Sequence, residues 1–299
     1  MNNKTWLLVI LLGFIWGSSF LFTEILLNYI NPVLIVFFRV SLASIILIIY
    51  VFFFTNLKFN FSKEILLTFF TMGLLNNVIP FLLIAFAQET ITGGLASILN
   101  ANTSFFTIFL ASLFLKDEKL TSHRLLGIII GIIGVIVIVG FENLSEFKNY
   151  NFGIVLMLFS CLSYSFAGIF AKTKLTNIHP TISATGMLSM STIILFPFII
   201  IYNGNELINI NSTVLYYSCM FAFICTVLAY FLYFKILETN GAGNLLICTI
   251  IIPPSSILLN AFFINEIIKI YELIGLIIIT LGLIILDGRI INYIKNRFI

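Results

Sequence analysis

The first half of this chain reappears in its second half, 148 residues later. The paired landmarks keep that spacing along the chain: Pro32 with Pro180, Glu118 with Glu266, Gly127 with Gly275, Gly134 with Gly282, and Gly140 with Gly288. Two units of similar structure are therefore expected. How the two units are oriented depends on the number of elements in each.

The solvent for most of this chain is lipid. Only 9% of its 299 residues are charged, against about a quarter in soluble proteins, and 61% are hydrophobic. Ten apolar runs are long enough for a helix to cross about 30 Å of hydrocarbon. The runs cover residues 6–27, 32–54, 65–87, 93–115, 123–140, 151–171, 181–202, 212–236, 241–264 and 270–291.

Five runs fall in each half, so the second copy must enter the membrane from the opposite side. The sequence therefore predicts an all-α integral membrane protein with ten transmembrane helices, built as two inverted five-helix repeats over residues 1–143 and 151–299. Inverted repeats are typical of secondary transporters, whose halves rock about a site near the bilayer midplane.

Basic residues set the expected orientation. With the amino terminus inside, twelve of the 15 Lys and Arg residues fall on the cytoplasmic side, and only Lys148 and Lys269 fall outside. We expect a multi-pass protein of the inner or plasma membrane with both termini cytoplasmic. The first run is too long for a cleaved signal peptide and leads directly into the second, so it is expected to remain in the mature protein.

Several classes of function find no support in the sequence. The four cysteines lie inside predicted spans at spacings that match no metal or haem motif. His123 and His179 lie in different turns, without a nucleophile motif or a glycine-rich phosphate loop. The net charge of +3 reflects loop asymmetry. We therefore expect no enzyme activity, no cofactor, no metal and no nucleic-acid partner.

Short motifs in a fixed order resemble a known family. They are WGSSF at 16–20, Pro32 followed by FRVSLA at 38–43, and ASLFL at 111–115 followed by DEKL at 117–120. Pro253, Glu266 and Gly275 repeat part of the pattern in the second half. The chain resembles, over nearly its whole length, the EamA-type branch of the drug/metabolite transporter superfamily.

The resemblance implies a ten-helix carrier that moves small metabolites, most often outward. Its cavity would be lined by helices 1, 3, 4, 6, 8 and 9, with helices 5 and 10 behind. A proline often found in helix 4 of the family is Phe105 here, whereas Pro253 and Pro254 occupy helix 9. We therefore expect a kinked helix 9 and a straighter helix 4.

Polar side chains inside spans mark the expected substrate path, because hydrocarbon tolerates them only next to protein or water. The candidate substrate-binding residues combine depth in the membrane with repeat symmetry. They are Trp16, Asn76, Asn77, Asn100, Tyr164 and Tyr230. The alternative is that such residues join helices by hydrogen bonds, and we expect this of roughly half of the polar residues in the spans.

Glu24 and Arg39 are a candidate ion pair or coupling pair. Helical rise places them at similar depths below the turn between the first two spans. The pair would either tie two helices together or act in transport, with Arg39 holding a substrate carboxylate and Glu24 exchanging a proton.

The sequence as a whole predicts a secondary transporter that works by alternating access. Its aromatic and amide lining favours an amino acid or a related zwitterionic or aromatic compound, with export as the expected direction. The alternatives are an importer of a quaternary amine such as choline, or a channel that is not a carrier. The expected partners are a small-molecule substrate and the lipid bilayer. The stripe of Gly127, Gly131 and Gly134 permits close helix packing or a homodimer contact.

Overall fold

The computed structural model describes residues 3–59, 62–139, 149–204, 207, 210–240 and 245–288. Its α-helices are α1 (Asn3–Leu27), α2 (Pro32–Phe54), α3 (Lys63–Gly73), α4 (Ile79–Ala87), α5 (Gly93–Asn100), α6 (Asn102–Phe114), α7 (Ser122–Val139), α8 (Asn149–Lys174), α9 (Pro180–Tyr202), α11 (Ser212–Ala222), α12 (Ala229–Asn240), α13 (Leu245–Ile264) and α14 (Ile270–Asp287). Ten of the helical stretches are long and apolar enough to span a membrane, which confirms the predicted spans.

Parts of the predicted organisation lie outside the described residues. These are residues 140–148 between the two halves, the start of the ninth run at 241–244, and residues 1–2 and 289–299 at the chain ends.

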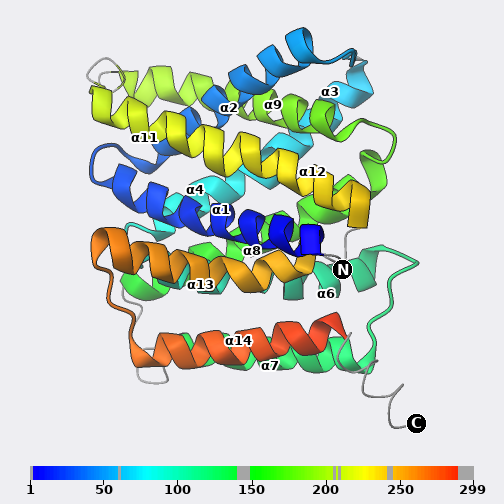
Figure 1. Ribbon diagram of the computed structural model, residues 1–299, viewed down its shortest axis with the longest axis vertical. Helices are drawn as coiled ribbons and strands as arrows, with labels where there is room; N and C mark the ends of the chain where they lie inside the picture. Colours follow the sequence, from blue (N-terminus) through cyan, green and yellow to red (C-terminus); the bar gives the residue numbers. More distant parts are fainter. Residues whose placement is uncertain are drawn as a thin grey trace.

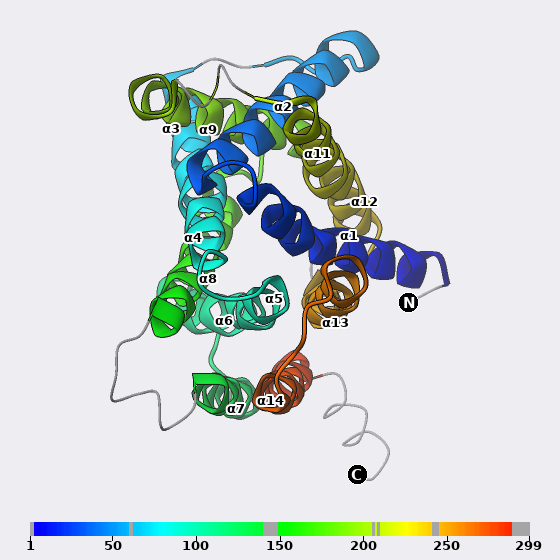
Figure 2. The same cartoon turned by 90° about the vertical axis from the view of Figure 1, so that its left-hand side faces the viewer.

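The spans run side by side and alternate in direction (Figure 1), so that α1 begins and α14 ends on the same side of the bundle. We call this side the Lys172 end, because α8 finishes there with Lys172 and Lys174. The opposite side is called the Glu24 end, and there α1 finishes and α5 begins at Gly93. Viewed along the helices, α7 and α14 form a pair at one edge of the molecule (Figure 2).

Glycine allows α7 and α14 to pack backbone to backbone. A methyl group added to Gly127 would lie 2.7 Å from the carbonyl oxygen of Gly282, and one added to Gly282 would lie 2.9 Å from that of Gly127. Small residues give this approach in lipid, where no hydrophobic force drives helices together. The predicted glycine stripe therefore packs within one chain, mostly against α14. A homodimer contact through these helices stays a prediction.

The fourth span consists of two helices, α5 and α6, which only Ala101 separates, whereas α13 is a single helix that contains Pro253 and Pro254. The predicted difference in bend between the two spans stays a prediction. The side chain of Asn102 donates to the carbonyl of Leu99 over 2.8 Å, and such local bonds compete with the helical ladder.

The third span contains a π-helical segment at Leu74–Val78, just before Pro80. The N–H of Ile79 donates to the carbonyl of Leu74, five residues earlier. The next hydrogen bond of this π-helical pattern would join an N–H of residue 80 to the carbonyl of Leu75. Proline has no N–H to donate. The hydroxyl of Ser163 in α8 donates to the Leu75 carbonyl instead, over 2.8 Å. The irregular turn is thus satisfied by a neighbouring helix, as the membrane interior requires.

Replacing Gly127 with leucine should destabilise the protein by about 1–3 kcal/mol, because the larger side chain cannot fit against the α14 backbone. The measurement is thermal unfolding in detergent. The lipid-facing substitution Ile132→Leu is the matched control and should leave the melting temperature unchanged. An equally small effect of both substitutions would contradict the described packing of α7 against α14.

Replacing Ser163 with alanine should destabilise the protein by about 1–3 kcal/mol, the cost of an unsatisfied buried carbonyl. In a Pro80→Ala background the restored N–H can reach Leu75, so the same substitution should cost much less. Thermal unfolding of the wild-type protein, the two single variants and the double variant gives this difference as a double-mutant cycle. Equal costs of Ser163→Ala in both backgrounds would show that the hydroxyl does not replace the missing donor.

Candidate functional site

Arg39 lies in α2 and is surrounded by neutral groups. Its Nε donates to the hydroxyl of Thr226 over 3.1 Å. Its guanidinium carbon lies 3.8 Å from the ring centre of Phe81 and 4.5 Å from that of Phe221. Within the described part of the chain, Arg39 makes no ion pair. A positive charge is therefore held by cation–π contacts and one hydroxyl.

The predicted pairing of Arg39 with Glu24 is wrong. The carboxylate of Glu24 instead accepts a hydrogen bond from the side chain of Gln88, over 3.0 Å. Counting residues along a helix gives the depth of a side chain. It does not give the direction in which the side chain points, and here α1 turns Glu24 toward α5 while α2 turns Arg39 toward the eighth span.

Three of the predicted substrate-binding residues gather near Arg39. Tyr164 and Tyr230 both lie close enough to interact electrostatically with the guanidinium. The side-chain amide of Asn76 donates to the hydroxyl of Tyr230 over 3.3 Å, and Tyr164 packs edge-on against Phe81. All four polar residues are partly exposed although they lie within spans. We call Arg39, Asn76, Tyr164 and Tyr230 the Arg39 site.

Trp16 reaches this site through a row of aromatic rings. Its ring centre lies 5.9 Å from that of Tyr233, which packs against Phe234, and Phe234 stacks on Tyr230. Gly17 lets α1 approach α13 closely, since an added methyl group would lie 2.8 Å from Ser255. Tyr233 is thus the direct neighbour of Trp16.

Asn77 and Asn100 lie apart from the hydrogen bonds of the Arg39 site. Asn77 is fully buried and donates to Ser191 in α9 over 3.0 Å. Asn100 ends α5, and its side-chain oxygen is buried without a hydrogen-bond partner among the described residues. Asn77 thus joins two helices, whereas Asn100 keeps a free acceptor beside the break at Ala101.

A second polar cluster occupies the Glu24 end. The carboxylate of Glu266, in the turn after α13, accepts from the N–H of Gly94 over 3.1 and 3.2 Å. Gln88, whose side chain donates to Glu24, lies beside the adjacent Gly93, since a methyl group added there would lie 3.2 Å from its Nε2. Burial raises the pKa of the Glu266 carboxyl above its ordinary value. Two carboxylates from different parts of the chain therefore meet at the start of α5.

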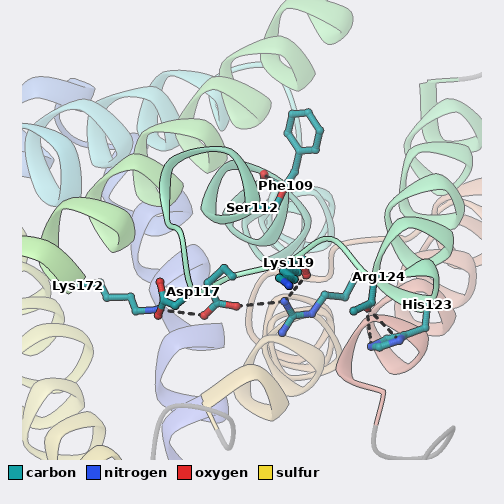
Figure 3. Close-up of polar contacts among 9 residues, drawn as sticks. Phe109, Ser112, Asp117, Lys119, His123, Arg124 and Lys172 are labelled. Atoms are coloured by element: carbon teal, nitrogen blue, oxygen red, sulfur yellow. Dashed lines mark hydrogen bonds and ion pairs between the residues drawn. The ribbon is translucent and has the colours of Figure 1, made fainter.

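Opposite charges meet at the Lys172 end (Figure 3). Lys172 binds Asp117 over 2.8 Å and Glu118 over 3.1 Å, and Arg124 binds Glu118 over 3.1 Å. The hydrogen bond from Lys172 holds the pKa of both the Asp117 and Glu118 carboxyls below their ordinary values. These contacts connect the turn after α6 to the end of α8.

Sequence reasoning missed Phe81, Phe221 and Gln88. Nothing distinguishes the two rings among 33 phenylalanines. Gln88 was detectable as a polar residue at the end of a span, and it is almost fully buried.

The chain is similar to known transporters over nearly its whole length. The sequence model of the EamA-like transporter family matches it twice, at residues 3–140 and 151–286. An uncharacterized transporter of Archaeoglobus fulgidus is 28% identical over 97% of this chain and 99% of its own length. The uncharacterized transporter YoaV of Bacillus subtilis is 21% identical over 94% of this chain and 95% of its own.

A solved structure, titled only as the crystal structure of a protein, shares the fold. It has a TM-score of 0.67 at 14% identity and covers 96% of this chain and 98% of its own. The family match over both halves shows that the chain belongs to the EamA-like transporter family, within the drug/metabolite transporter superfamily, and the ten helices long enough to span a membrane agree with it.

Proposed function

We propose that this protein is a secondary transporter that exports a small metabolite, an amino acid or a related zwitterionic or aromatic compound, by alternating access. The observation that carries the proposal is the charge of Arg39, which has no carboxylate partner among the described residues. A small-molecule substrate and the bilayer are the partners that the proposal requires.

An ionised side chain inside a membrane protein is costly unless a partner compensates it. The aromatic rings and the Thr226 hydroxyl supply part of that compensation. A substrate carboxylate would supply the rest, because guanidinium binds carboxylates through paired hydrogen bonds. The amide of Asn76 and the hydroxyls of Tyr164 and Tyr230 are then placed to orient the polar remainder of the substrate. The row of rings that leads to Trp16 suits an apolar or aromatic side chain.

Two features support two equivalent halves that rock about this site. The family match occurs once in each half. The π-helical segments Leu74–Val78 and Phe223–Leu228 begin within one residue of the 148-residue spacing of the repeat. Each segment contributes to the Arg39 site, through Asn76 and through the Thr226 contact. π-Helical turns occur often at functional sites. In this proposal the Lys172 end faces the cytoplasm, as do both termini.

The Arg39 charge argues against a quaternary amine. The aromatic faces that could bind such a cation are already occupied by the guanidinium, which would also repel it. An anionic group on the substrate is the better match.

The proposal is tested by counterflow of labelled L-amino acids in vesicles that contain the purified protein. Arg39→Gln should weaken the apparent affinity for the transported compound by roughly 10- to 100-fold, the range for a lost hydrogen bond to a charged group. Arg39→Lys should recover part of the affinity. The same compound with its carboxylate converted to an amide should not be transported by the wild-type protein.

Lys235→Gln is the matched control, because it removes a positive charge at an exposed position near the Lys172 end. It should leave counterflow unchanged. Unaltered affinity in folded Arg39→Gln protein would remove Arg39 from the substrate site. The absence of counterflow for every amino acid of the panel would contradict the proposed substrate class.

A further inference from the structure

Two carboxylates lie at the start of α5. Glu24 of α1 accepts from Nε2 of Gln88, which lies 3.2 Å from a methyl group added to Gly93, and Glu266, which follows α13, accepts from the N–H of Gly94. Gly93 and Gly94 belong to the first turn of a helix, where anions are favoured. The helix terminus compensates about half of one charge. It does not compensate two.

Two buried amide oxygens beside these carboxylates accept no hydrogen bond within the described part of the chain. They are Oε1 of Gln88 and Oδ1 of Asn260, whose side chains are 4% and 0% exposed. Both amides border Gly93, since an added methyl group there would lie 3.0 Å from Oδ1 of Asn260 and 3.2 Å from Nε2 of Gln88. Buried acceptors without donors are rare and costly. Two buried acceptors of the cluster therefore lack a donor among the described residues.

The donors around the pair face the carboxylates themselves in the part of the chain that the structure describes. Glu24 faces the side chain of Gln88, Gly93 and Glu266. Glu266 faces the Thr92 hydroxyl, the N–H of Gly94 and a further carboxylate, Glu272. The nearest lysine in the sequence, Lys269, has its ammonium 5.6 Å from the ring centre of Tyr271.

A proton fits the cluster better than a metal ion. The N–H of Gly94 and the side-chain amide N–H of Gln88 point at the carboxylates, and they would repel a cation that needs a shell of oxygens. No group of three or more His, Cys, Asp and Glu side chains suited to a metal is found among the described residues. A proton needs only one carboxylate oxygen, and it turns that group into a donor.

We propose that Glu24 and Glu266 together hold one exchangeable proton when the Glu24 end is closed, and that this is the proton-binding site of the transporter. The proton lies on one carboxyl while the other stays ionised, so the pair carries a single negative charge. Two like charges in a poorly solvated site favour this arrangement. The inference rests on the proposed transport function.

Among the described residues, the Lys172 end has no equivalent pair of carboxylates, so a proton would be bound and released at the Glu24 end only. By the 148-residue spacing, Lys172 corresponds to Glu24, and Glu118 corresponds to Glu266. Lys172 binds Glu118 over 3.1 Å, so the equivalent contact at the Lys172 end is already neutralised. Opening the Glu24 end would expose both carboxylates to water, which favours their ionised forms. Release of the proton would therefore accompany opening at this end and would be absent at the other.

Infrared spectroscopy of the purified full-length protein tests the site with the proton itself as the probe. The wild-type protein should show the carbonyl band of a protonated carboxyl near neutral pH, and the band should disappear as the pH is raised. Glu24→Gln and Glu266→Gln should each lose this band, since the remaining carboxylate keeps its amide donor, Gln88 or Gly94, and no longer faces the carboxylate of the other glutamate. Glu118→Gln is the matched control and should keep the band.

A wild-type protein without a titrating carboxyl band between about pH 5 and about pH 9 would overturn the proposal, even if the glutamine variants did not fold. A band that survives both substitutions would also overturn it. So would loss of the band on adding sodium chloride in place of choline chloride, because that result would assign the site to a metal cation. The two proposals fail separately: counterflow without the band refutes the proton site, and the band without counterflow refutes transport of the tested amino acids.

Discussion

One positive charge in an apolar interior organises the centre of this protein. Arg39 cannot be left alone in hydrocarbon, and the structure surrounds it with Phe81, Phe221 and the Thr226 hydroxyl. These contacts come from the third and eighth spans, so the guanidinium connects elements of both halves of the chain. They also leave the charge without a counter-ion among the described residues. A structural arginine would gain from a carboxylate neighbour, whereas a binding arginine must keep its capacity for the ligand.

The membrane itself explains why much of the fold could be predicted. A span must satisfy its backbone internally and needs about 20 apolar residues, so length and hydropathy were enough to find all ten. The aromatic and amide residues Tyr164, Tyr230 and Asn76 were found by the same logic, since polar groups in spans are restricted to protected places. The side chains of all three lie next to Arg39 or to one another.

The remaining details depend on the direction in which a side chain points and on local competition for hydrogen bonds. Residue counting gave Glu24 and Arg39 similar depths and could not show that they face different neighbours. Proline predicted a kink in helix 9, whereas nothing in the sequence predicted the separation of α5 from α6 at Ala101, where the side chain of Asn102 donates to the Leu99 carbonyl. Asn76 and Asn77 are adjacent in sequence, yet one reaches Tyr230 and the other reaches Ser191. Such differences come from packing between distant segments.

The most direct test of the Arg39 site asks whether water-soluble molecules can reach it. Asn76→Cys, in a background with the exposed Cys219 replaced by serine, can be treated with a membrane-impermeant thiol reagent from either side of sealed vesicles. Alternating access predicts reaction from each side in separate experiments, without a continuous leak of ions. Lack of reaction from both sides would show that Arg39 and its neighbours are packing residues, and the central claim would be wrong.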